Sequence, residues 1–164
     1  MAHTADCTQA ELLEEFWLRA HTALPELPAE SPEAWSFGAT PAHADQLLEL
    51  VLAGIKTATS SSLWDLDATG EPVPQVGDLS ILLDGRDRPR AVIETVDVVT
   101  VPFSAVSAEH AYAEGEDDRT LETWRSGHEA FWRRYAESSR VFAADMPVVC
   151  ERFRLLWREV EAPA

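Results

Sequence analysis

The chain has 164 residues, of which 46% are hydrophobic and 26% charged, as in an ordinary globular protein of one domain. Its 29 acidic side chains outweigh 13 basic ones, and the formal net charge of -16 excludes tight, sequence-independent binding to duplex DNA. Neither a signal-peptide pattern nor a membrane-length apolar stretch is present, so we expect a cytoplasmic protein without a membrane partner. The composition leaves the oligomeric state open.

The first third of the chain predicts two helices joined by a proline-bearing connector. Thr8 and Glu11 form a capping-box pattern ahead of apolar residues at helical spacing, which predicts a helix over 8–22. Three prolines make residues 23–35 an extended connector. A second helix is expected over 41–53, where threonine and proline open an apolar periodic run.

The rest of the chain predicts two strands, two helices and a final strand. Two apolar or β-branched runs flank a tight turn and indicate an antiparallel pair. Ser107 and Thr120 are candidate N-caps of the two helices. The expected ranges are a turn-rich loop over 65–78, strands over 79–84 and 89–101, a helix from 107 to about 114, a helix after 120, and a strand over 147–157.

Neither cysteine belongs to a metal-binding pattern, so Cys7 and Cys150 are expected to be free thiols. His110 and Glu114 lie one helical turn apart and could form half of a metal site, but no third ligand has a suitable spacing. We therefore expect neither a metal nor another cofactor.

Lys56 is the only lysine of the chain, and every other basic side chain counted is an arginine. It follows the helix predicted over 41–53, where the helix carbonyls favour a cation, but an arginine would serve that purpose equally well. A desolvated lysine can act as a base toward a hydroxyl nucleophile, which a permanently charged guanidinium cannot do. Lys56 is therefore a candidate catalytic residue.

Several motifs, in this order, resemble the ASCH domain family in its longer bacterial form. They cover about residues 36–157 and read FG, LVLAGIKTATSS, EPVPQVGD, AVIET, VPF, AEGE, LETWRSGHEAFW and VVCERFRLL. The resemblance implies an α+β fold, a PUA-like mixed β-barrel with flanking helices and an N-terminal helix. We accordingly divide the chain into an N-terminal helix and connector, 1–35, packed on an ASCH domain, 36–158.

The resemblance also implies a link to RNA, because family members include ribonucleases on single-stranded RNA and an amidohydrolase of N4-acylated cytidine. In that hydrolase the lysine and threonine of a G-x-K-x-x-T motif act with a glutamate on a following strand. Here the first two fall on Lys56 and Thr59, and the best match for the third is Glu94. Members differ in substrate, so the resemblance implies the fold more strongly than the activity.

These three side chains can share a cleft only if the backbone bends between Lys56 and Thr59, because side chains three apart on a regular strand face opposite sides. Glu94 would orient the ammonium or pass a proton to the leaving amine, and Thr57 or a backbone amide would stabilise the oxyanion. The alternative is structural: a helix-terminal cation, a β-forming threonine and a surface glutamate.

Further candidate substrate-binding residues come from aromatic and polar positions. A base could stack on Trp124 while Arg125 or His128 meets a phosphate or carbonyl, although Trp124 could equally belong to the core and His128 be a satisfied, half-buried histidine. Ser60 of the hydroxyl-rich segment and Trp64 could also line the pocket.

The sequence thus predicts a metal-independent hydrolase acting on RNA or on an N4-acylated cytidine-type nucleoside, with single-stranded RNA or a nucleoside or nucleotide as ligand. The acidic stretch AEGEDDRTLE is expected to be a solvated turn, and near the cleft it would repel phosphates and weaken the ribonuclease interpretation. The alternative is a non-catalytic RNA- or nucleotide-binding module in which Lys56 pairs with a phosphate.

Overall fold

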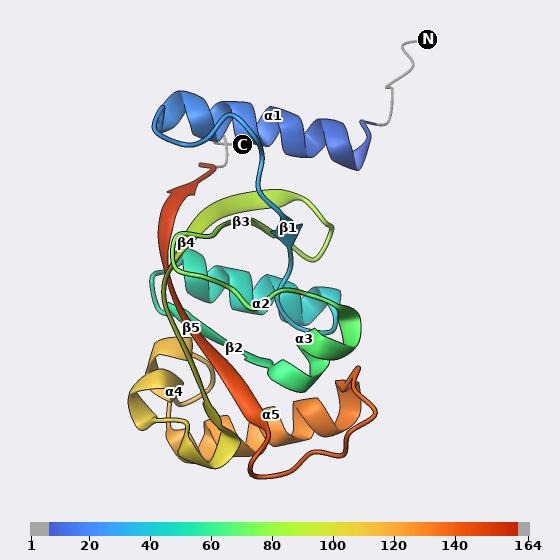
Figure 1. Ribbon diagram of the computed structural model, residues 1–164. Helices are drawn as coiled ribbons and strands as arrows, with labels where there is room; N and C mark the ends of the chain where they lie inside the picture. Colours follow the sequence, from blue (N-terminus) through green and yellow to red (C-terminus); the bar gives the residue numbers. More distant parts are fainter. Residues whose placement is uncertain (1–6, 161–164) are drawn as a thin grey trace.

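The computed structural model describes residues 7–160, in which helices lie at both ends of a mixed sheet and a further helix lies across its middle (Figure 1). The first helix lies at one end of the long fourth and fifth strands, and the last two helices lie at the other end. The elements are α1 (Gln9–Ala23), β1 (Ala34–Trp35), α2 (Pro41–Leu52), β2 (Ala58–Ser62), α3 (Leu63–Thr69), β3 (Leu79–Leu83), β4 (Pro89–Pro102), a 3-10 turn (Phe103–Ala105), α4 (Ala108–Glu114), α5 (Leu121–Tyr135) and β5 (Pro147–Arg158).

The sheet is mixed and open. Its strand order is β1-β3-β4-β5-β2, with β1 parallel to β3 and the other neighbours antiparallel. The edge strands β1 and β2 do not pair with each other within residues 7–160, so hydrogen bonding does not close the sheet. The expected mixture of helices and a mixed sheet is confirmed, whereas the expected PUA-like barrel is not.

Most helices and strands begin within a residue or two of their predicted limits because the local caps are present. The Thr8 side chain accepts from the Glu11 amide and the Glu11 carboxylate accepts from the Thr8 amide, which completes the predicted capping box. The prediction of a loop over 65–78 is wrong for residues 65–69, which belong to α3. The Ser62 hydroxyl accepts from the Asp65 amide and caps α3, which ends at Gly70 in the left-handed conformation.

Three apolar clusters hold the helices to the sheet. The α1 helix packs through Phe16 and Trp17 on the β3–β4 end, so the N-terminal helix lies against the rest of the described chain; residues 1–6 of that predicted unit lie outside the described range. The α2 helix packs through Leu48 and Val51 on β4 and β5. The third cluster joins α4 and α5 to the far end of β5. The space between the second and third clusters holds the candidate site.

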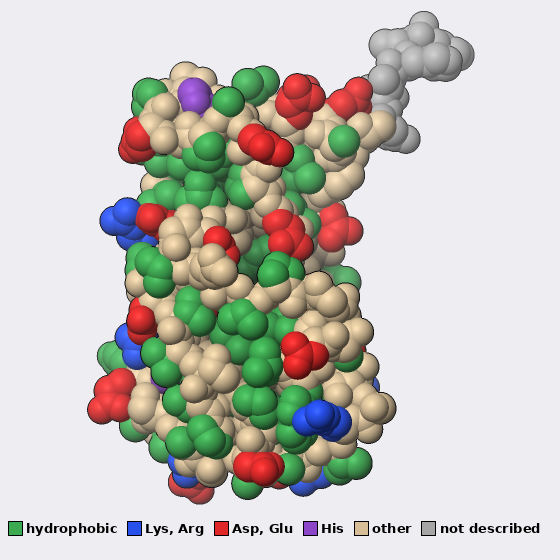
Figure 2. Space-filling view, in the orientation of Figure 1, with side chains coloured by type: hydrophobic (Ala, Val, Ile, Leu, Met, Phe, Trp, Pro, Cys, Tyr) green, Lys and Arg blue, Asp and Glu red, His purple; other side chains and the backbone are tan. Residues whose placement is uncertain are grey.

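The excess of acidic over basic residues in the sequence is visible on the surface (Figure 2). Figure 2 shows acidic side chains spread over one face, with fewer basic ones among them. Among residues 7–160, no helix combines the length and apolar character needed to cross a membrane.

Candidate functional site

A pocket of about 210 Å³ lies between α2, α5 and the start of β2. Aromatic rings supply much of its wall and a lysine, carboxylates and hydroxyls supply its polar part. The lining residues are Phe37, Gly38, His43, Leu47, Lys56, Thr59, Ser60, Glu114, Glu116, Asp117, Thr123, Trp124, Gly127, His128, Phe131 and Trp132.

The α2–β2 connection places Lys56 in this pocket. Gly54 takes a left-handed φ of 76°, and the amides of Ile55 and Lys56 both donate to the Leu50 carbonyl, which turns the chain back on the helix. Strand β2 starts only at Ala58, so Lys56 precedes the regular strand and shares the pocket with Thr59. The predicted bend is therefore present.

The Lys56 side chain is buried, with 2% of the residue exposed, and meets three acceptors. Its Nζ lies 3.1 Å from Glu116 Oε2, 3.5 Å from Glu114 Oε1 and 3.4 Å from the Glu114 carbonyl oxygen. The Phe37 ring lies beneath it, with 5.3 Å between Nζ and the ring centroid. As an ammonium, Lys56 donates hydrogen bonds to the Glu114 carbonyl oxygen and Glu116 Oε2 and forms an ion pair with Glu114 Oε1.

Glu114 is the buried centre of the polar network. The Trp124 indole nitrogen and the Ser60 hydroxyl donate to its Oε2, the latter at 2.9 Å. The Nε2 atoms of His110 and His128 each lie 3.4 Å from the same oxygen. Burial alone would raise the pKa of this carboxyl, but the charge of His128, hydrogen bonds from both histidines and the charge of Lys56 hold it well below its usual value.

His128 is a second basic side chain that contacts Glu114. Its ring stacks on Trp124 with 4.2 Å between centroids, and its Nδ1 lies 2.9 Å from the Trp124 carbonyl oxygen. Burial works against the protonated form, yet the Glu114 carboxylate raises the pKa of His128 above its ordinary value, with a further contribution from Glu116. With His128 protonated, two cations, Lys56 and His128, balance two carboxylates.

Gly115 sets the approach of the carboxylates to the lysine. It follows α4 with a φ of 72°, and a Cβ atom there would lie 2.7 Å from the Ile55 carbonyl oxygen. A side chain at this position would push the turn away from the α2–β2 connection. The close contact brings Glu114 and Glu116, on either side of the glycine, to Lys56.

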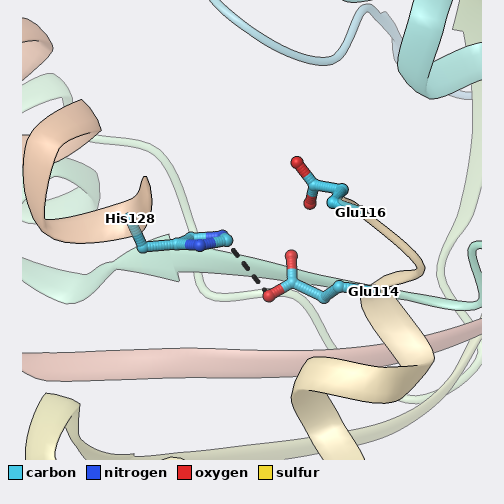
Figure 3. A group of neighbouring side chains, drawn as sticks. All are labelled: Glu114, Glu116 and His128. Carbon is cyan, nitrogen blue, oxygen red and sulfur yellow. Dashed lines mark ion pairs between the residues drawn. The ribbon is translucent and has the colours of Figure 1, made fainter. Parts of the chain in front are cut away.

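Glu114, Glu116 and His128 point toward one another and offer three metal-ligand atoms within 4.8 Å (Figure 3). The histidine comes from α5, Glu114 is the last residue of α4, and Glu116 lies on the segment that follows. This donor set suits a divalent cation, but the Lys56 ammonium contacts both carboxylates. A metal ion would have to displace that ammonium, so the three residues fit a metal poorly while Lys56 stays in place. The absence of a metal remains a prediction.

The pocket brings together five of the predicted site residues, namely Lys56, Thr59, Ser60, Trp124 and His128. Trp124 is only 5% exposed and His128 covers one of its faces, so the core interpretation of this tryptophan fits the structure better than a base-stacking one. His128 is likewise the satisfied, half-buried histidine of the alternative interpretation.

Four predicted site residues lie elsewhere. The Thr57 hydroxyl donates to the Ala113 carbonyl outside the pocket, and Trp64 packs on the α5 cluster beneath the Arg140 guanidinium. Arg125 donates to the Ser104 carbonyl.

Glu94 is the most consequential of these, because it was the expected catalytic carboxylate. It is paired with Arg154 across the β4–β5 ladder, with Arg154 Nη2 2.6 Å from Glu94 Oε2. Glu94 does not line the pocket. The structure places Glu114 and Glu116 beside Lys56 instead.

Sequence reasoning missed both of these carboxylates as partners of Lys56. The stretch that holds them was expected to be a solvated turn, which is wrong for Glu114, of which 1% is exposed. The AEGE motif indicates only a left-handed turn at Gly115 and not that this turn faces Lys56.

Comparisons with known proteins identify the family. The family model described as "ASCH domain" matches residues 33–157. The chain belongs to the ASCH domain family. Its fold is similar to that of protein EF3133 from Enterococcus faecalis, with a TM-score of 0.81, 34% identity and coverage of 90% of this chain and 89% of that one.

A second similar structure is an ASCH domain from Lactobacillus crispatus, with a TM-score of 0.75 and 27% identity over 94% of this chain and 98% of that one. No curated protein matches the chain.

Proposed function

We propose that this ASCH domain protein is a metal-independent amidohydrolase that cleaves the exocyclic amide of an N4-acylated cytidine-type nucleoside. The observation that carries the proposal is the buried Lys56 ammonium, held 3.1 Å from Glu116 at the wall of the pocket. A fixed cation beside a carboxylate is the pair that amide hydrolysis requires, since one proton must be removed from the nucleophile and one delivered to the leaving amine.

Glu116 is the better placed of the two carboxylates to exchange protons with a substrate. Its side chain is 22% exposed and lines the pocket, whereas the Glu114 side chain is 2% exposed and engaged by Trp124 and Ser60. Glu114 orients Lys56 and His128. In this arrangement Glu116 takes the role that the resemblance assigned to Glu94.

The Thr59 hydroxyl supplies the nucleophile. It lines the pocket, and within residues 7–160 no hydrogen bond engages it, whereas Ser60 is bonded to Glu114 and lies 2.7 Å from His110 Nε2. Thr59 Oγ1 attacks the acyl carbon as its proton passes to Glu116, and Lys56 stabilises the oxyanion. The C–N bond breaks as the leaving amine takes that proton from Glu116. Water then attacks the acyl ester as its proton passes to Glu116, and Thr59 recovers the proton from Glu116 when the carboxylic acid is released.

The pocket's charge supports an amide substrate over RNA. Three acidic side chains, Glu114, Glu116 and Asp117, line it, and the two cations Lys56 and protonated His128 offset only two of them. A phosphodiester would meet this negative charge without a free arginine in the pocket lining to offset it. RNA cleavage and non-catalytic RNA or nucleotide binding are the competing outcomes.

A comparison of two glutamate substitutions tests the proposal. Wild type, Glu116→Gln, Thr59→Val and the control Glu94→Gln are assayed with N4-acetylcytidine and with a short single-stranded RNA in the presence of a chelator. We expect wild type and Glu94→Gln to release acetate, and Glu116→Gln and Thr59→Val to lose at least about 100-fold in kcat, the low end for general acid-base catalysis.

Loss of activity in Glu94→Gln with retention in Glu116→Gln would overturn the assignment from geometry. Cleavage of RNA alone would replace the amide with a phosphodiester. Binding of the nucleoside or RNA without turnover would leave only the binding-module alternative.

A further inference from the structure

A second, larger groove of about 570 Å³ opens between the two edges of the sheet. Its walls come from the segment around β1, from β2 and α3, from the loop before β3 and the start of that strand, and from one residue each of β4 and β5. The lining residues are Pro32, Glu33, Trp35, Ser36, Thr59, Ser61, Leu66, Glu71, Pro72, Pro74, Asp78, Leu79, Ser80, Thr95 and Glu151. It lies where hydrogen bonding leaves the sheet open, between β1 and β2.

The groove meets the candidate active site at Thr59, which lines both spaces. The two walls continue from one space to the other: Trp35 and Ser36 line the groove and the next residue, Phe37, lines the pocket. On β2, Ser60 contacts His110 of α4 while its neighbour Ser61 lines the groove, as expected for alternating strand side chains. A substrate bonded at Thr59 can therefore extend in both directions.

The groove differs from the pocket in chemistry. Four carboxylates and several hydroxyls line it, and its lining contains no lysine, arginine or histidine. Glu33, Glu71 and Asp78 are exposed, whereas Glu151 is buried and accepts a 2.6 Å hydrogen bond from Thr95. Burial raises the pKa of Glu151; the Thr95 hydrogen bond lowers it, and the nearby Asp78 charge raises it further. The exposed carboxylates near the rim supply a negative field.

Size and shape decide which part of a substrate enters which space. The smaller, aromatic-walled pocket suits a flat pyrimidine ring, whereas the larger groove can hold a chain of variable length. With the scissile carbonyl at Thr59 and the ring in the pocket, the acyl substituent points into the groove.

We propose that the groove is the acyl-binding subsite and that its carboxylates select acyl groups carrying an ammonium group over neutral and anionic ones. This inference rests on the proposed amide hydrolysis at Thr59 for the orientation of the ligand. The substrate class becomes cytidines N4-acylated with an amino acid or another aminoacyl group. An acyl group with a terminal carboxylate is repelled by the same side chains.

Binding measured separately from turnover tests the subsite. The Thr59→Val protein, which keeps the side-chain shape but lacks the nucleophile, is titrated calorimetrically with three cytidines whose N4 substituents are 6-aminohexanoyl, hexanoyl and 5-carboxypentanoyl. At low ionic strength we expect the aminohexanoyl compound to bind at least about tenfold tighter than the carboxypentanoyl one, and the difference to shrink in 0.5 M salt because the rim charges are exposed.

Matched charge variants locate the effect. In the same Thr59→Val background, Glu33→Gln with Glu71→Gln removes two rim carboxylates and should abolish most of the preference. Glu26→Gln with Glu30→Gln removes the same charge from exposed positions of the connector that do not line the groove, and should preserve it. Equal affinities for the three compounds, or equal effects of the two double substitutions, would overturn the subsite.

Wild-type turnover of N4-acetylcytidine and of the 6-aminohexanoyl compound separates this inference from the proposed function. A charge preference in binding without turnover by wild type would keep the groove assignment and reject the hydrolysis. Turnover without any charge preference would keep the hydrolysis and reject the groove assignment.

Discussion

The two carboxylates that contact Lys56 should separate stability from catalysis when each is replaced by glutamine. The Glu114 side chain is 2% exposed and the Lys56 side chain 1%, so Glu114→Gln breaks a buried ion pair. Breaking such a pair costs about 3–5 kcal/mol, because the remaining charge is left buried. Glu116 still contacts Lys56, so we expect the lower end, about 3 kcal/mol.

Glu116→Gln is the matched control for that perturbation. Its side chain is 22% exposed, so solvent screens its pair with Lys56 and the cost should be at most about 1 kcal/mol. Activity should respond in the opposite way to stability: Glu116→Gln loses turnover while remaining folded.

Urea denaturation followed by tryptophan fluorescence measures both variants, with the midpoint and the m-value compared to wild type. In a thermal scan, 3 kcal/mol corresponds to a fall of roughly 6–12 °C for a domain of this size. A cost below about 1 kcal/mol for Glu114→Gln at an unchanged m-value would show that water reaches the pair, and would refute the argument from burial.

Four further outcomes are expected. Because the folded-state pKa of His128 is raised, its contribution to the free energy of unfolding is fully present below pH 6.5 and lost as pH rises through the raised value, so His128→Gln should remove this alkaline loss in urea titrations across pH 5–9. Gly115→Ala forces an alanine into a left-handed conformation against the Ile55 carbonyl, which should cost at least about 1–2 kcal/mol in urea unfolding and reduce turnover; a fully active variant of wild-type stability would contradict the close approach. Burial raises the pKa of Cys150 to about 11, so a thiol reagent at pH 8 should label exposed Cys7 rapidly and Cys150 slowly, as followed by mass spectrometry. A chelator should leave turnover unchanged, and activation by added Mn²⁺ or Zn²⁺ would show that a metal displaces the Lys56 ammonium.

Local sequence determined the elements and one half of the site. Caps such as Thr8 and Thr120 and the glycine stop at Gly54 act within a few residues, so the limits of the helices could be predicted from short patterns. Lys56 is the only lysine and lies between a predicted helix and a predicted strand, so the sequence alone indicated it as a candidate catalytic residue. The family resemblance rested on the same short motifs.

The partners of Lys56 were decided by tertiary structure alone. Glu114 and Glu116 lie 58 and 60 residues further along the chain, and they reach Lys56 because Gly115 lets the end of α4 approach the α2–β2 connection. Strand alternation at Glu94 showed that it could point outward, but not that the β4–β5 register places Arg154 opposite it. No pattern of spacing reports such a contact, because the packing of separate elements sets which distant side chains meet.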